Sequence, residues 1–101
     1  RVVIATRHGQ HATLAAEALR AGKAVFVEKP LALWPDELAE VLAAQQASGQ
    51  TLMVGYNRRF SPLAVRSKQL LDELSAGPIS AVITINAGAV PATSWLHDRP
   101  T

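Results

Sequence analysis

Three short apolar runs rich in β-branched residues, each followed by a segment with helical character, constrain the fold more than any other feature of this chain. The runs cover residues 2–6, 24–28 and 52–54. Continuous apolar runs of this length are typical of strands that are covered on both faces of a parallel sheet. The sequence therefore predicts a β-α-β-α-β-α order with crossover helices between parallel strands.

The helical segments are expected at residues 11–21, at 35–48 and from Ser61-Pro62 to Gly77. The middle one has the clearest boundaries, because Pro35 suits a first helical turn and Gly49 suits the position after a last one. An apolar stripe should turn each helix toward the sheet. The residues expected to point inward are Leu14, Ala15, Ala18, Leu19, Leu38, Val41, Leu42, Leu63, Leu70 and Leu74.

The pattern changes after residue 78, where apolar and polar residues alternate from Ile79 to Asn86. A period of two predicts a strand of an antiparallel sheet with one face more buried than the other. We therefore expect two domains. Residues 1–78 would be the second half of a nucleotide-binding, doubly wound α/β domain, and residues 79–101 the start of a mostly antiparallel α/β domain. The chain opens directly in an apolar run and stops in a polar segment, so we expect a piece of a longer protein.

Composition narrows the function classes. Hydrophobic residues make up 49% of the chain and charged residues 18%, which indicates a folded domain. The net charge of +2 comes from scattered basic residues, so a nucleic-acid partner is the least favoured of the alternatives. The chain has no cysteine, and no apolar run approaches the roughly 20 residues that cross a membrane. We expect a cytoplasmic protein with no membrane partner.

Polar and charged residues follow each predicted strand. They are Thr6-Arg7-His8, Glu28-Lys29-Pro30 and the run Gly55-Tyr56-Asn57-Arg58-Arg59. Parallel strands present their carboxyl ends at one edge of the sheet, where α/β domains bind their ligands. The sequence therefore predicts a binding site at this edge.

Lys29 is the candidate for chemistry at that edge. Lysine suits proton transfer because burial shifts its pKa readily, and Pro30 could fix the direction of the chain next to it, possibly through a cis bond. The alternative is a loop lysine paired with the neighbouring Glu28.

Other candidates have simpler alternatives as well. His8 and His11 close no metal site by themselves, so we expect no metal, and His11 could instead be a helix-start histidine hydrogen-bonded to the backbone. Arg58 could grip an anionic or carbonyl oxygen, or be surface charge. Trp95 and His97 could line a sugar pocket. The chain has no G-x-G-x-x-G turn, so a pyrophosphate site would lie upstream of residue 1.

Two runs carry a resemblance to a known family. They are Val-Ile-Ala-Thr-x-His-x-x-His continuing into Gly-Lys-x-Val-x-Val-Glu-Lys-Pro-Leu, and Leu-Met-Val-Gly-Tyr-Asn-Arg-Arg-Phe-Ser-Pro. Over residues 2–78 the chain resembles the family of glucose-fructose oxidoreductase, inositol dehydrogenase and rhizopine-catabolism oxidoreductases. The stretch from Asn86 to Trp95 is similar to a bacterial branch in which this module follows an alcohol-dehydrogenase-like region.

The resemblance implies a Rossmann domain that binds NAD or NADP. It places Thr6, Arg7, His11, Glu28, Pro30, Asn57 and Arg58 at the cofactor, with Pro30 often in the cis form. Lys29 would lie between the nicotinamide and the substrate hydroxyl, and substrate contacts would come from Lys29, Arg58, Trp95 and His97. The family's second catalytic group has no match here. Trp34 stands where relatives often carry a Ser or Thr helix cap.

The implied activity is hydride transfer between nicotinamide and a sugar or polyol carbon in the full-length protein, with the isolated chain inactive. Two alternatives of the same fold are a non-catalytic NAD(P)-binding regulator and an interaction module. An open apolar edge at residues 2–6, or the segment 79–86, would favour a homo-oligomer.

Overall fold

The computed structural model describes residues 1–74, 77–86 and 88–94 of the chain. The chain divides into two compact units, Arg1–Phe60 and Ser61–Thr101, which are described separately. The first unit contains the elements β1 (Val2–Ile4), α1 (His11–Arg20), β2 (Val25–Glu28), α2 (Pro35–Ser48) and β3 (Leu52–Gly55), with short 3-10 turns η1 at His8–Gln10 and η2 at Asn57–Phe60. The second unit contains helix α3 (Pro62–Leu74).

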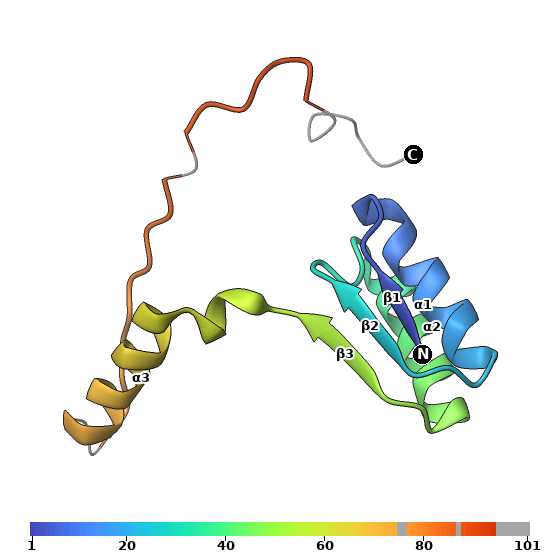
Figure 1. Cartoon of the computed structure of the whole chain (residues 1–101), viewed down its shortest axis with the longest axis horizontal. Coiled ribbons are helices and arrows are strands. Elements are labelled where there is room, and N and C mark those ends of the chain that lie inside the picture. Colours follow the sequence, from blue (N-terminus) through green and yellow to red (C-terminus); the bar gives the residue numbers. More distant parts are fainter. Residues whose placement is uncertain (75–76, 87, 95–101) are drawn as a thin grey trace. The chain divides into compact units, whose positions relative to one another are not determined.

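The first unit is built on a three-stranded parallel sheet in the order β1-β2-β3 (Figure 1). Val25 of β2 pairs with Val2 on one side and with Leu52 on the other. At the carboxyl ends, Ile4 pairs with Val27, and Glu28 pairs with Gly55. The parallel α/β arrangement that the three apolar runs predicted is thus confirmed, and the expected helix at 35–48 has the same bounds as α2.

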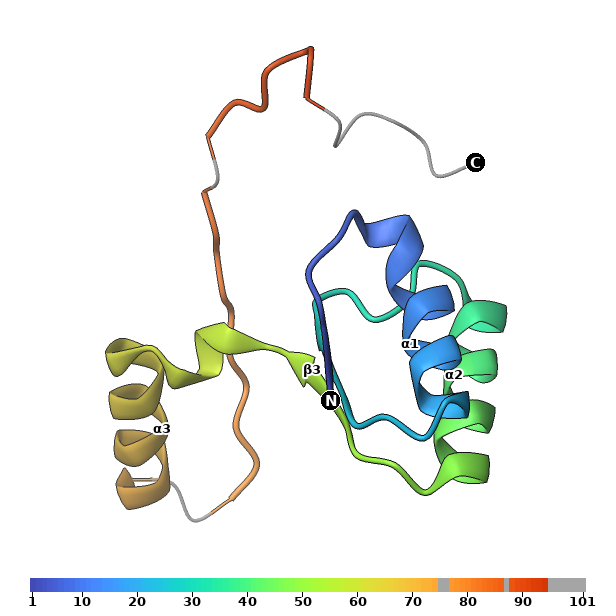
Figure 2. The same cartoon turned by 45° about the vertical axis from the view of Figure 1, so that its right-hand side comes forward.

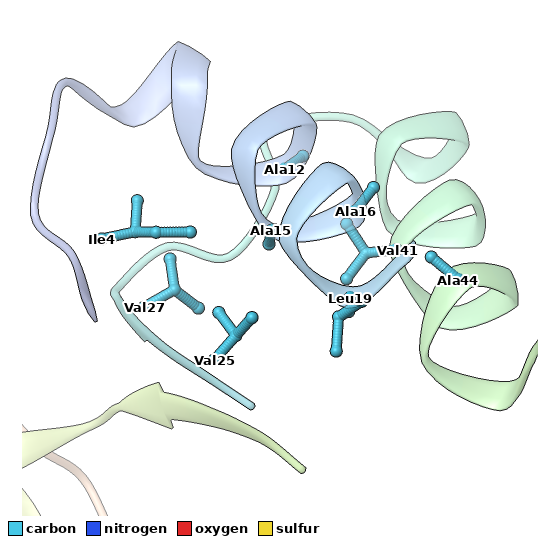
Figure 3. Close-up of a cluster of buried hydrophobic side chains, with 9 residues drawn as sticks. All are labelled: Ile4, Ala12, Ala15, Ala16, Leu19, Val25, Val27, Val41 and Ala44. Carbon is cyan, nitrogen blue, oxygen red and sulfur yellow. The ribbon is translucent and has the colours of Figure 1, made fainter. Parts of the chain in front are cut away.

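Helices α1 and α2 pack side by side on one face of this sheet (Figure 2). Figure 3 shows the core, in which Val25 and Val27 of the sheet face the side chains of α1, while Val41 comes from α2. Alanines on α1 let the helix approach both layers closely. The buried core consists of Ile4, Ala12, Ala15, Ala16, Leu19, Val25, Val27, Val41 and Ala44.

Helix α2 begins with a cap that its own first turn supplies. The Glu37 carboxylate accepts hydrogen bonds from the backbone N–H of Leu33 at 2.8 Å and of Trp34 at 3.2 Å. Glu37 thus supplies the half of a capping box in which the third helical residue reaches back to the N-cap backbone. The Trp34 indole cannot accept a hydrogen bond, so it does not supply the other half, in which a Ser or Thr at position 34 would bind an N–H of the first turn. The helix ends at Gly49, whose φ of 63° is the left-handed conformation that glycine adopts at low cost.

Several leucines expected to point inward are exposed instead. Leu14 of α1 and Leu38 and Leu42 of α2 lie outside the buried core, and Leu63 of α3 is 82% exposed. An apolar stripe becomes buried only where another element packs against it. Among the described residues of the first unit, α1 and α2 cover one face of the sheet. In the second unit, α3 has no buried residue.

The strand expected over residues 79–86 is not observed in the structure. In the structure these residues form neither strand nor helix, and they are exposed along their whole length. Alternation specifies which face of a strand is buried, but a strand also needs a hydrogen-bonded neighbour. Within the described residues of the second unit, this segment has no such neighbour. No helix in the described part of the chain is long and apolar enough to span a membrane.

Candidate functional site

The carboxyl edge of the sheet brings together the three polar segments that the sequence singled out. Thr6 lies two residues after β1, Lys29 directly follows β2, and Tyr56 directly follows β3. Because all three strands are parallel and in register, these segments leave the sheet at the same edge of the first unit. The convergence rests on backbone pairing within one compact unit and therefore holds without reference to the second unit.

His11 lies beneath this edge. Its ring is 1% exposed and is the one buried polar side chain of the described residues. Nδ1 lies 2.7 Å from the carbonyl oxygen of Pro30, and Nε2 lies 3.0 Å from the carbonyl oxygen of Thr6. Both ring nitrogens are thus engaged by backbone carbonyl oxygens, and the expectation that His11 contacts a cofactor stays a prediction. The alternative, a helix-start histidine bonded to the backbone, describes what is observed.

The segment after β2 turns sharply through a cis peptide bond between Lys29 and Pro30. Lys29 is exposed and, within the described residues, makes no ion pair with Glu28. The simple alternative of a Glu28–Lys29 pair is therefore absent from the structure. The ammonium of Lys29 is left available to a ligand at the edge.

His8 lies in η1 and packs its ring edge-on against that of His11, with ring centroids 5.7 Å apart. Partial burial, followed by electrostatic repulsion from the neighbouring His11 and Lys29, lowers the pKa of His8 from its ordinary value of 6.5. His8 is therefore predominantly neutral at pH 7, and it senses the charge of Lys29. The sequence predicted that His8 and Lys29 follow neighbouring strands at one edge, but it did not predict that His8 packs against His11.

Glu28 occupies a position that depends on Gly55. The two residues are partners across the β2–β3 ladder. A β-carbon on Gly55 would lie 3.2 Å from the carboxyl carbon of Glu28 and 3.1 Å from the Phe26 ring. The absent side chain of Gly55 therefore makes room for the Glu28 carboxylate over β3. The sequence does not show this pairing, because it does not fix the register of the β2–β3 ladder.

The other expected site residues are placed as follows. Thr6 is exposed, and its hydroxyl donates a long bond of 3.4 Å to the carbonyl oxygen of Arg7. Asn57 and Arg58 are exposed in η2, while the guanidinium of Arg59 lies 4.6 Å above the Phe60 ring. Trp95 and His97 lie outside the described residues. Within those residues, no group of three or more His, Asp or Glu side chains could hold a metal ion.

A shallow hollow of mostly apolar lining lies elsewhere in the first unit. It runs along β1 and α1 and is lined by Val2, Val3, Ile4, Thr6, Leu14, Glu17, Ala18, Ala21 and Lys23. Lys29 and Glu28 are not part of it. The hollow follows from the free edge of β1 rather than from the polar edge, so we place the candidate site at the polar edge.

The donor set at that edge suits part of a dinucleotide. The Glu28 carboxylate can accept hydrogen bonds from ribose hydroxyls, and Lys29 can approach a second hydroxyl-bearing ligand. Pyrophosphate recognition needs a Gly-rich turn at a helix start, and this sequence has none. The residues present therefore suit a ribose and do not account for the pyrophosphate.

Comparison with known proteins supports this picture. Residues 1–56 match the model of a family described as "Oxidoreductase family, NAD-binding Rossmann fold". The chain is 34% identical over 96 residues to an inositol 2-dehydrogenase of Rhizobium meliloti, an alignment that covers 94% of this chain and 29% of that protein. It is 42% identical over 67 residues to the oxidoreductase YrbE of Bacillus subtilis, covering 66% of this chain and 20% of that protein.

A solved structure is similar as well. A putative oxidoreductase from Klebsiella pneumoniae superposes with a TM-score of 0.67 at 38% identity, covering 71% of this chain and 21% of that chain. Across these comparisons, the chain spans between 20% and 29% of the relatives' own length.

Proposed function

This chain belongs to the oxidoreductase family with an NAD-binding Rossmann fold, and from that membership we propose that it forms the nicotinamide-side edge of an enzyme that oxidises a sugar or polyol hydroxyl. Two of the similar proteins are named as an inositol 2-dehydrogenase and an oxidoreductase. Because the chain spans less than a third of their length, we propose the activity for a longer polypeptide that contains it, called here the intact oxidoreductase, and no turnover for the chain alone.

The observation that carries the proposal is the position of Lys29. Lys29 follows β2 directly and is exposed. It lies at the edge of the sheet where the carboxyl ends of β1 and β3 also lie. A bound nicotinamide would supply the hydride acceptor or donor. When a hydroxyl carbon gives up hydride, the hydroxyl oxygen must lose its proton. We assign the Nζ of Lys29 as the proton acceptor, a role that requires Lys29 to have released its own proton before this step. General base help of this kind is worth about 10²–10⁴-fold in rate.

The neighbouring residues then have positioning and binding roles in the proposal. Glu28 accepts hydrogen bonds from the ribose hydroxyls and orients the nicotinamide against Lys29. Thr6 and Arg7 line the same edge from β1, and Asn57 and Arg58 line it from η2. Arg58 holds an oxygen of the substrate or of the carboxamide. Trp95 and His97 are proposed substrate contacts from the sequence alone.

The test compares Lys29→Met with Lys23→Met in the intact oxidoreductase. Lys23 precedes β2, so it lies toward the opposite edge of the sheet and serves as a matched control. Turnover would be followed as NADH and as NADPH formation with inositol and other polyols. We expect Lys29→Met to lower kcat by about 10²–10⁴-fold while NADH binding stays within a few-fold. Near-normal turnover of Lys29→Met would refute the proposed role.

We also propose a cytoplasmic location for the enzyme, and self-association of the 101-residue chain through β1. In the described residues β1 is an outer strand of the sheet β1-β2-β3, so one of its edges is unpaired. Unpaired apolar strand edges recruit further strands. Light scattering of the 101-residue chain should show self-association that rises with concentration, and a monomer at all concentrations would contradict this part of the proposal.

A further inference from the structure

His11 connects two segments that lie far apart in sequence and meet at the candidate site. Its ring nitrogens reach the carbonyl oxygen of Thr6, five residues earlier, and that of Pro30, 19 residues later. His11 is the first residue of helix α1, and it is 1% exposed. A buried ring thus joins Thr6, two residues after β1, to Pro30, the residue after Lys29.

The chemistry of the two contacts makes them unequal. Carbonyl oxygens only accept hydrogen bonds, so a ring nitrogen must carry a proton to bind one. A neutral imidazole carries one such proton, whereas a doubly protonated ring carries two. The contact to Pro30 is the shorter, at 2.7 Å against 3.0 Å for Thr6. The geometry therefore favours a proton on Nδ1, donated to the carbonyl oxygen of Pro30.

We propose that His11 is a positioning residue that holds the Lys29-Pro30 segment through an Nδ1–H bond to the carbonyl oxygen of Pro30 and thereby aims Lys29 at its substrate. The proposal rests on the proposed function of Lys29 and deepens it, because it names the residue that orients the base. His11 has no contact with substrate in this role. It acts through the backbone next to Lys29.

Burial is what makes this contact effective. At the surface, water would compete for the Pro30 carbonyl and the segment would be free to shift. Beneath the edge, the His11 ring is enclosed, and loss of its donor leaves the part-buried carbonyl oxygen of Pro30 without this partner. A small displacement of a catalytic group can cost about 10²-fold in rate, so a shift of the Lys29 segment should be visible in turnover.

The first experiment needs only the 101-residue chain. Nitrogen-15 NMR of the histidine rings assigns the protons on each ring nitrogen of His11 at pH 7. A proton on Nδ1, in the neutral or in the doubly protonated ring, supports the proposal. A ring protonated only at Nε2 overturns it, because the Pro30 carbonyl would then have no donor. This result is independent of any enzymatic activity.

The second experiment uses the intact oxidoreductase with three variants. His11→Phe removes both donors at similar size, and His11→Gln restores N–H donors on a flexible amide. Val41→Ala is the control, because Val41 is a fully buried residue of α2 with no part in the site, so its loss weakens the core alone. We expect His11→Phe to lower kcat between about 10- and 100-fold with the KM for NAD changed less than threefold, and His11→Gln to recover part of that loss.

The outcomes separate the two proposals. If His11→Phe lowers kcat no more than Val41→Ala does at comparable stability, the positioning role is refuted while the role of Lys29 stands. If Lys29→Met keeps near-normal turnover, the proposed function fails, whatever the His11 variants show. If His11→Phe does not fold, the NMR assignment and the His11→Gln variant still decide the question.

Discussion

Gly55 and Glu28 are ladder partners, and the carboxyl group of Glu28 occupies the space that a side chain at position 55 would fill. The backbone of Gly55 needs no positive φ, so its lack of a side chain matters for space and not for conformation. The finding links a residue with no chemistry of its own to the proposed ribose-binding carboxylate. It also makes the first prediction specific.

We predict that Gly55→Ala destabilises the first unit and moves Glu28. The added methyl group would lie 3.1 Å from the Phe26 ring and 3.2 Å from the Glu28 carboxyl group, so both side chains must shift. Overpacking of this kind costs about 1–3 kcal/mol, and we expect a loss near the lower end because the Glu28 side chain can move. Urea unfolding of the 101-residue chain measures the change.

Gly9→Ala is the matched control, because a β-carbon at Gly9 would meet nothing within 4 Å. In the intact oxidoreductase, Gly55→Ala should also weaken NADH binding, since the displaced carboxylate is the proposed ribose partner. Equal stability of the two variants would show that the space at Gly55 does not contribute to the stability of the first unit.

The second prediction concerns the charge of Lys29 as sensed by His8. Burial lowers the pKa of His8 most, and the charges of His11 and Lys29 lower it further. Lys29→Met should therefore raise the pKa of His8, although it should stay below 6.5 because burial persists. An NMR titration of the His8 ring measures this directly. Lys23→Met is the control, because Lys23 precedes β2 and lies toward the opposite edge of the sheet, so it should leave the titration unchanged. An unchanged pKa in Lys29→Met would place Lys29 away from His8.

The same group gives a pH dependence of stability with a defined sign. The folded state binds a proton at His8 more weakly than the unfolded state, so acid favours unfolding. The contribution of His8 is fully present above pH 6.5 and is lost as the pH falls through the lowered pKa of the folded chain. The variant His8→Gln should show a shallower loss of stability below pH 6.5 than the unsubstituted chain.

The third prediction tests the cap of α2. Glu37→Ala removes the acceptor for the N–H groups of Leu33 and Trp34 and should cost about 1 kcal/mol in urea unfolding. Glu37→Gln keeps an acceptor oxygen and should lose less. Glu40→Ala is the control, because it breaks only the half-exposed ion pair with Arg20, a kind of pair worth roughly 0–1 kcal/mol. A Glu37→Ala variant as stable as Glu40→Ala would refute the capping role.

The sequence and the structure agree where local patterns are sufficient. The helix over residues 35–48 has the predicted bounds because Pro35 and Gly49 fix both of its ends. The parallel order of strands was also predictable, because three apolar runs separated by helices leave few other arrangements. Local patterns could not show which apolar faces are covered. Leu38 and Leu63 carry the same periodicity as buried leucines, yet they are exposed because nothing in the described part of their units packs on them.

Sequence alone predicted that this chain forms parallel strands whose carboxyl ends carry Thr6, Lys29 and Arg58, since the parallel direction follows from strands that alternate with helices. Only the tertiary structure decided that His11 is buried between Thr6 and Pro30, that Glu28 depends on Gly55, and that residues 79–86 form no strand. The physical reason is that hydrogen bonds and close contacts between distant residues depend on how the elements are placed in space, and periodicity does not record that placement.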